Sequence, residues 1–422
     1  MDPGVSPLSA WQTEIWLAMQ LADTGSAFNL PMRVRVHGEV SVERLHEAFA
    51  AVCEDNEQLR TVIDADAPLQ HVLTGMPAAG DSTPGDPREA ERIFAAMAGE
   101  PFALGGPLLR FAYARHDEPA VELLLVVHHL VFDGTSQKLL VDSLAERCAG
   151  QPVRSGCLPY ADYAARNRAG LAPATAVRPW SAALAALRAS AVQGAARFGP
   201  LDWVQFRLSG PVLERFKSER RRLGCSVAEL WLASFAAAVR AGGSAVPIVR
   251  LGVDARPDGF AATMGNFTNV LPLVAPSSRS LEARIAEAKT SFGWAKAAKA
   301  DASGELLARE DRAALSSAPI MTHRRFARAV RAGGCTVTAD AFVPTRTAKA
   351  PFVLQSIDYG DEVALRLEFD ARAIGAGQRR AVASAFADDL ALLGIAPDVT
   401  ACADGMPDER DAGERPMSNT RR

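Results

Sequence analysis

One stretch of the sequence, LLLVVHHLVFDG at residues 123–134, restricts the fold more than any other. Five aliphatic residues in a row are typical of a strand that is buried on both faces. His128 and His129 follow the run directly, and Asp133-Gly134 comes just before a segment with helical character. Ionisable side chains are costly to bury at a strand end, so the histidine pair serves either a structural hydrogen bond or chemistry.

Composition excludes several classes of function. The chain has 422 residues, of which 48% are hydrophobic, which suffices for about two to three domains with a sizeable core. A net charge of -3 offers no basic face for nucleic acid. The six cysteines form no C-x-x-C pair, and no His, Cys or carboxylate falls at metal-ligand spacing from the histidine pair. We therefore expect a cytoplasmic protein with no metal, no nucleic-acid partner and no membrane association.

Periodicity predicts mixed strands and helices along both halves of the chain. Ser9 is placed to cap a helix that ends near Leu21, and MRVRVHG at residues 32–38 alternates like a half-buried strand. A last helix is expected from apolar residues at helical spacing, namely Val382, Phe386, Leu390 and Leu393. Residues 166–179 are rich in Ala, Pro and Gly, which indicates a connection between two similar α/β units.

The pattern H-H-x-x-x-D-G at residues 128–134 resembles the condensation domains of nonribosomal peptide synthesis. Further stretches resemble other motifs of that family in the family's order: LSAWQTEIW (8–16), NEQLRT (56–61), LPYADY (158–163), VDAR (253–256) and GNFTNVLPL (265–273). Two departures stand out. Asp55-Asn56 replaces the Arg-His of the second motif, and no stretch matches the sixth motif, H-Q-x-x-P-F.

The resemblance implies an α/β (α+β two-layer) fold. Two chloramphenicol-acetyltransferase-like lobes would form a V-shaped pseudo-dimer with a central tunnel. We assign residues 1–175 to the N-terminal lobe that carries H-H-x-x-x-D-G and residues 176–396 to the C-terminal lobe. Residues 397–422 are polar and charged, which predicts a disordered tail.

The resemblance also gives roles to individual residues. His129 matches the catalytic position, where an imidazole acts as a base or orients the nucleophile and stabilises the tetrahedral intermediate. His128 points to the opposite side of a continuing strand and is expected to pack and hydrogen-bond. The family pairs Asp133 with the arginine of its second motif, here Arg60, and such a buried ion pair would fix the loop.

Three further residues complete the predicted site. Gly134 would let a backbone pass close to the reacting carbonyl. Ser136 is expected to cap the following helix and also to present its hydroxyl to the tunnel. Asn269 matches the asparagine of the fifth motif; it either hydrogen-bonds an acceptor or caps a strand end. Two basic stretches are candidate docking surfaces for a carrier protein: one helix face with Arg324, Arg328 and Arg331, and a cluster of Lys217 with residues 220–222.

The function that follows is that of a stand-alone, monomeric condensation enzyme. It would transfer an acyl or peptidyl chain from the 4'-phosphopantetheine thioester of an acyl or peptidyl carrier protein to an amine or hydroxyl. The acceptor is either a small molecule or bound to a second carrier, and no cofactor is expected on this chain. The alternatives are an epimerization domain, a coenzyme-A-dependent acyltransferase of the same superfamily, and a non-catalytic recruitment domain. The intact histidine pair and Asp133-Gly134 favour an active enzyme.

Overall fold

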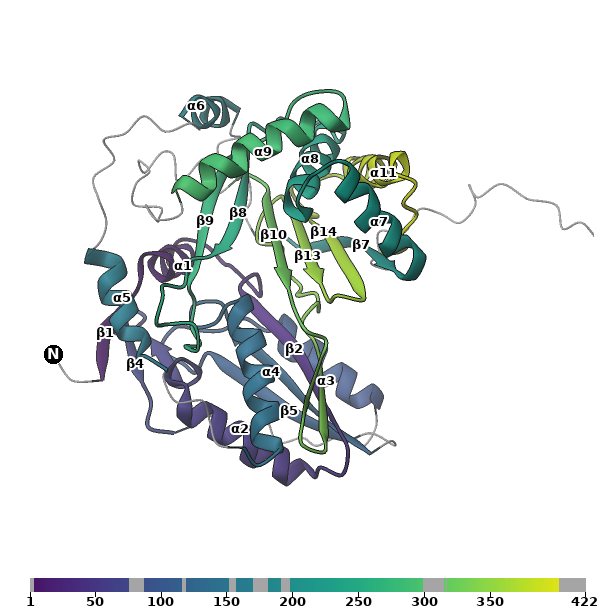
Figure 1. Ribbon diagram of the computed structural model, residues 1–422. Helices are drawn as coiled ribbons and strands as arrows, with labels where there is room; N and C mark the ends of the chain where they lie inside the picture. The colour runs from purple at the N-terminus through teal and green to yellow at the C-terminus, as the bar shows by residue number, and fades with distance from the viewer. Residues whose placement is uncertain are drawn as a thin grey trace, which may run out of the picture.

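The computed structural model contains two lobes, each built on its own sheet (Figure 1). The parts of the chain that the structure describes are residues 4–75, 87–115, 119–151, 157–169, 181–190, 198–298, 315 and 317–401. A third, small sheet lies beside the N-terminal lobe and has the strand order β1-β4-β3. Its strands are β1 (Val5–Pro7), β4 (Leu69–Val72) and β3 (Thr61–Ile63).

The sheet of the N-terminal lobe is antiparallel throughout, in the order β11-β12-β2-β6-β5. Its strands are β11 (Ala329–Ala332), β12 (Cys335–Asp340), β2 (Asn29–His37), β6 (Ala120–His128) and β5 (Leu109–Arg115). Every residue of β6 is buried, as the aliphatic run predicts. The other elements of this half are α1 (Ala10–Leu21), α2 (Val42–Asp55), the 3-10 helix η1 (Glu57–Arg60), α3 (Pro87–Gly99), α4 (Gly134–Cys148) and α5 (Tyr160–Ala169).

Helices α2 and α4 pack against one face of this sheet and form the core of the lobe. Met32, Val34 and Val36 of β2 are fully buried in that core. Side chains alternate along a strand, so Arg33 and Arg35 lie on the opposite face of the sheet. That face of the sheet therefore carries charge.

The sheet of the C-terminal lobe has the order β15-β7-β14-β13-β10-β8-β9, and α7, α8, α9 and α11 gather on one side of it (Figure 1). Its strands are β15 (Asp398–Ala401), β7 (Leu201–Ser209), β14 (Glu362–Asp370), β13 (Phe352–Asp358), β10 (Ile320–Arg325), β8 (Ile248–Asp254) and β9 (Thr268–Val274). The helices of this half are α6 (Ser181–Ser190), α7 (Gly210–Arg222), α8 (Val227–Ala241), α9 (Leu281–Ala298) and α11 (Ala376–Leu392).

Local signals placed several elements correctly. Ser9 caps α1, where its side chain and that of Gln12 form a capping box. In α11 the side chains of Val382, Phe386 and Leu390 are buried, in line with their helical spacing. The predicted connection at 166–179 and the boundary at 175 fall largely outside the described residues.

The division of the chain into lobes differs from the expectation at two places. Strands β11 and β12 come from the range assigned to the C-terminal lobe, yet β12 pairs with β2 in the N-terminal sheet. The chain therefore crosses from one lobe to the other after β10 (Figure 1). The predicted disordered tail is also wrong at its start, because β15 pairs with β7 and extends the C-terminal sheet. Residues 402–422 lie outside the described residues.

Within the described part of the chain, no single helix is long and apolar enough to cross a membrane. Helices α7 and α8 reach that length and composition only when taken together, with a bend of 95° between them.

Candidate active site

His129 begins the loop that joins β6 to α4, and the backbone fixes its ring. Its backbone N–H donates to the carbonyl of Phe28 at 2.8 Å, and Nδ1 lies 2.7 Å from the carbonyl oxygen of Phe132. A carbonyl oxygen only accepts, so Nδ1 carries the proton in this contact. In the neutral ring Nε2 then holds the free lone pair, which is the arrangement that a general base requires.

The surroundings of His129 keep this ring neutral. Burial lowers its pKa to about 4, and the positive charge of Lys349 acts in the same direction. The Phe132 carbonyl and the Asp133 carboxylate oppose the shift without reversing it. At neutral pH the imidazole is therefore an acceptor at Nε2 and carries no charge.

His128 lies in the core of the N-terminal lobe. Its ring makes edge contacts with Phe28 and Phe102 at centroid distances of 6.0 and 5.6 Å. Its Nδ1 accepts the backbone N–H of Leu130 at 3.2 Å, and burial lowers its pKa to about 3. His128 thus packs and hydrogen-bonds, on the side of the strand that the alternation predicts.

Asp133 pairs with Arg256, and the predicted pairing with Arg60 is wrong. Arg256 Nη2 lies 3.2 Å from Asp133 Oδ1, and both side chains are about 95% buried. Arg60 instead donates to the backbone carbonyls of Cys53, Glu54 and Leu73. These hydrogen bonds hold η1 against the end of α2 and against the chain after β4. The sequence did contain a signal for the true partner, since Arg256 ends the VDAR stretch just upstream of the fifth-motif stretch.

The Asp133 carboxylate is also the cap of α4. Its Oδ1 accepts the backbone N–H of Ser136 at 2.7 Å, so Asp133 rather than Ser136 occupies the N-cap position. Its Oδ2 accepts the backbone N–H of Phe267 at 3.0 Å. One side chain thereby joins the helix start, Arg256 and the segment that leads into β9, and these donors satisfy its buried oxygens.

Ser136 and Asn266 complete the connection between the two lobes. Ser136 Oγ lies 2.8 Å from Asp133 Oδ1 and 2.9 Å from both the carbonyl oxygen and the N–H of Gly265. The Nδ2 group of Asn266 donates to the backbone carbonyl of His129. Residues 265–267 of the fifth-motif stretch therefore dock directly on the histidine loop.

The fourth-motif stretch packs on the same place through Tyr160. This side chain is fully buried, and its hydroxyl donates to the carbonyl of Asn266 and lies 3.2 Å from Ser9 Oγ. A Cβ added at Gly265 would come within 2.3 Å of the Tyr160 ring, so glycine is required for this contact. Gln12 of the first-motif stretch donates to the carbonyl of Leu130 at 2.9 Å. Four separate stretches thus converge on residues 128–136.

The space beside Gly134 is occupied by an arginine. A Cβ added at Gly134 would lie 2.6 Å from Nη1 of Arg324. The same guanidinium donates through Nη1 to Gln137 and through Nη2 to the carbonyl of Ala341. The glycine therefore leaves room for a guanidinium. The expected close approach of the backbone to a reacting carbonyl stays a prediction. Arg324 lies on β10 and Arg331 on β11, so the predicted helix face of three arginines is wrong. Their spacing suits a helix, but the segment pairs as strands in two different sheets.

Asn269 lies within β9 and is buried. Its Oδ1 accepts the backbone N–H of Val270, while its Nδ2 has no hydrogen-bond partner among the described residues. The role of Asn269 toward an acceptor remains a prediction.

The basic cluster of Lys217 with residues 220–222 lies on helix α7. Within it, Lys217 pairs with Glu214 and Arg222 pairs with Glu219.

The sequence reasoning missed Lys349. This half-buried ammonium is close enough for its charge to lower the pKa of His129, and burial in turn lowers the pKa of Lys349 itself. The signal that was missed is the stretch TAKAPF at residues 347–352, which contains Lys349. It ends in Pro351-Phe352, and the sixth motif, H-Q-x-x-P-F, also ends in Pro-Phe.

No group of three or more potential metal ligands occurs in the described part of the chain.

Comparison with protein families gives one match that covers most of the chain. The family model named Condensation domain matches residues 3–292. Bacitracin synthase 2 of Bacillus licheniformis is 31% identical over 170 residues, which are 39% of this chain and 6% of that protein. Fusarin C synthetase of Gibberella moniliformis is 28% identical over 183 residues, 42% of this chain and 5% of that protein. The chain thus spans only about a twentieth of the length of these relatives.

Solved structures agree on the fold. The first condensation domain of the CDA synthetase matches with a TM-score of 0.70 at 20% identity, over 96% of this chain and all of that one. The condensation domain of the Monacolin K polyketide synthase MokA gives 0.73 at 19% identity, over 93% and 98% of the two chains. The SgcC5 protein of Streptomyces globisporus gives 0.68 at 20% identity, over 93% and 100%. The two-lobed, chloramphenicol-acetyltransferase-like fold expected from the sequence is confirmed.

Proposed function

Because the chain belongs to the condensation-domain family, we propose that it is an active condensation enzyme that uses His129. It transfers an acyl or peptidyl chain from the phosphopantetheine thioester of a carrier protein to an amine or hydroxyl. The products are an amide or an ester of a nonribosomal peptide or hybrid polyketide pathway. We further propose that it works as a monomer on a carrier protein supplied as a separate chain.

The single observation that carries this proposal is the state of the His129 ring. Nδ1 is committed to the Phe132 carbonyl, and the pKa of about 4 leaves Nε2 unprotonated at neutral pH. A nucleophile that donates its N–H or O–H to Nε2 is both oriented and deprotonated as it attacks the thioester carbonyl. The proton then passes from the imidazole to the departing pantetheine thiolate as the tetrahedral intermediate collapses.

Charge near the ring supports the same reaction. The tetrahedral intermediate carries a negative oxygen, and the half-buried cations Lys349 and Arg324 lie in the region of His129 and Gly134. Fixed positive charge in a poorly solvated site favours a transition state that develops negative charge. The other residues act through position: Asp133 and Arg256 hold the histidine loop against the fifth-motif stretch.

The alternatives make different demands on the same residues. An epimerization domain would use the same histidine to remove the α-proton of a carrier-bound residue, and no acceptor would be consumed. A coenzyme-A-dependent acyltransferase would accept acyl-coenzyme A as well as the carrier. A recruitment domain would not need the Nδ1 contact that prepares Nε2, so this contact favours catalysis.

The test is turnover with a carrier protein added in trans. Acyl-loaded carrier is mixed with the enzyme and a panel of amines and alcohols, and intact-mass analysis follows the loss of the acyl group and the appearance of product. H129A should lose at least about 100-fold in rate while remaining folded. H71A, in the partly exposed histidine of β4, is the matched control and should keep full rate. Full activity in H129A would remove the assigned role.

A further inference from the structure

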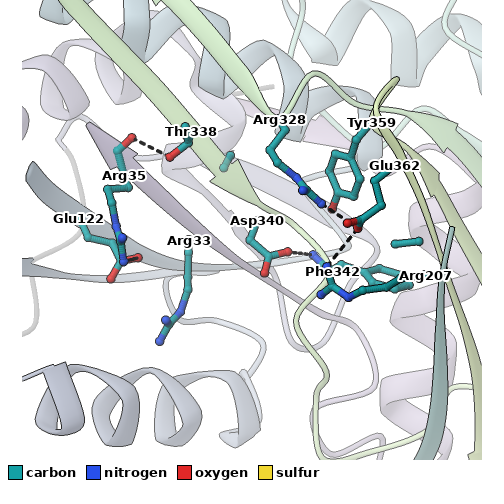
Figure 2. Close-up of a pocket in the computed structure, with 12 residues that line it drawn as sticks. Arg33, Arg35, Glu122, Arg207, Arg328, Thr338, Asp340, Phe342, Tyr359 and Glu362 are labelled. Atoms are coloured by element: carbon teal, nitrogen blue, oxygen red, sulfur yellow. Dashed lines mark hydrogen bonds and ion pairs between the residues drawn. The ribbon is translucent and has the colours of Figure 1, made fainter. Parts of the chain in front are cut away.

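A pocket of about 320 Å³ lies between the two lobes, away from the histidine loop. Arg35, Thr338 and Asp340 of the N-terminal sheet line one wall, and Arg207, Arg328 and Glu362 line the other (Figure 2). Arg33 is the register partner of Leu124, which lies four residues before His128 on β6. At the usual rise of a strand, the pocket begins roughly 13 Å from His128 along that strand.

The wall with Arg207, Arg328 and Glu362 has more guanidinium groups than carboxylates. Arg207 Nη1 and Arg328 Nη2 donate to the same oxygen, Oε1 of Glu362, at 3.0 and 2.9 Å. Two guanidinium groups therefore share one carboxylate. Each guanidinium has five N–H donors, so both keep donors for a further acceptor. Arg328 is also held in place over the ring of Tyr359, 4.2 Å from its centroid.

The opposite wall carries a carboxylate without an ion pair. Asp340 ends β12, is exposed, and accepts only the backbone N–H of Phe342 at 2.8 Å. Its cross-strand neighbour Arg33 forms a salt bridge with Glu91 on α3 instead, and its guanidinium lies over the ring of Phe94. Asp340 forms no salt bridge with any residue in the described ranges.

This arrangement selects a ligand that carries both charges. A simple anion at the arginines would face the Asp340 carboxylate across the pocket, and a simple cation at Asp340 would face the surplus guanidinium charge. We propose that the pocket binds a small zwitterion with an ammonium and a carboxylate, the class to which free amino acids belong. The ammonium lies at Asp340, and the carboxylate lies at Arg207 and Arg328.

Binding here joins the lobes. Asp340 belongs to the five-stranded sheet, and Arg207 lies on β7 of the seven-stranded sheet. Arg328 lies between β10 and β11, where the chain crosses from one sheet to the other. A ligand that contacts both walls adds a bridge between the two sheets, so it raises the melting temperature of the folded protein. The inference goes beyond the proposed function, because binding at this pocket does not require His129.

The probes are glycine, γ-aminobutyrate and glycylglycine, which differ in the spacing of their two charges. Ethylamine and acetate are the single-charge controls. We expect at least one zwitterion to bind saturably by calorimetry and to raise the melting temperature, with both single-charge compounds at least about tenfold weaker. D340N and R328Q should each weaken binding about tenfold or more, since each removes one charge-assisted contact.

Matched controls change the same charge elsewhere. D388N and R380Q alter exposed residues of α11 and should bind like the parent protein. H129A should bind normally even though it loses turnover, which separates failure of this inference from failure of the proposed function. The inference is overturned if none of the three zwitterions binds, if acetate or ethylamine matches them, or if D340N and R328Q both keep the parent affinity.

Discussion

The ion pair between Asp133 and Arg256 gives the sharpest prediction, because it replaces a pairing that the family resemblance implied. Both side chains are about 95% buried, and Arg256 Nη2 lies 3.2 Å from Asp133 Oδ1. Arg256 also donates to the carbonyl of Thr263 at 3.2 Å and stacks over Phe267 at 4.2 Å. Removing one partner of a buried pair leaves a charge without compensation, which costs about 3–5 kcal/mol. R256A should therefore lower the free energy of unfolding by that amount.

Arg60 supplies the matched comparison. Among the described residues its guanidinium donates to backbone carbonyls, and it is partly exposed, so water replaces most of its contacts when it is removed. R60A should cost about 1 kcal/mol. A double-mutant cycle with D133N isolates the pairwise contribution, and we expect about 1–3 kcal/mol of coupling with R256A and no more than about 0.5 kcal/mol with R60A.

The measurement is urea unfolding followed by tryptophan fluorescence and by circular dichroism, at low salt and at high salt. The loss in R256A should be nearly the same at both salt concentrations, because a buried pair is little screened. Strong coupling of R60A to D133N, together with weak coupling of R256A, would refute the assignment.

Three further predictions concern pH and packing. Because burial lowers the pKa of His129 to about 4, the rate should show no acid limb near pH 6.5 and should fall only as the pH approaches about 4; a limb near 6.5 in the pH–rate profile would contradict the burial. His128 and His129 both have folded pKa values below the ordinary 6.5, so the unfolded chain binds more protons between about 4 and 6.5. The stability they contribute is complete above about 6.5 and is lost as the pH falls through that window, which melting curves between pH 7 and 4.5 will measure. G134A should cost about 1–3 kcal/mol, because its Cβ would lie 2.6 Å from Arg324 Nη1. R324A in the same chain should recover part of that loss, and a G134A variant with parental melting would contradict the close approach.

Short residue patterns in the sequence were enough to predict much of the site. The aliphatic run before His128 fixed β6 as a buried strand, and Ser9 fixed the start of α1. The identity of the capping residue at α4 was harder, because Asp133 and Ser136 both have side chains that cap helices. In the structure Asp133 caps α4 through Oδ1, and its Oδ2 accepts the backbone N–H of Phe267.

Pairings between distant residues were beyond a single sequence. Arg60 and Arg256 are both arginines in motif stretches, and only the docking of residues 254–267 on the histidine loop places one of them within 3.2 Å of Asp133. The arginines at 324, 328 and 331 have helical spacing, yet strand pairing with two different sheets overrides it. The zwitterionic pocket depends on the same crossing, since β12 carries Asp340 into the sheet opposite Arg207.

The sequence by itself determined the family and the two-lobed fold and placed His129 just after a buried strand, because each motif stretch is a short local pattern that can be recognised on its own. Only the tertiary structure decided which cation meets Asp133, what fills the space beside Gly134, and which residues line the pocket between the two sheets. The physical reason is that an ion pair is set by distance and burial in space, and a linear pattern of like-charged residues leaves several equally suitable partners.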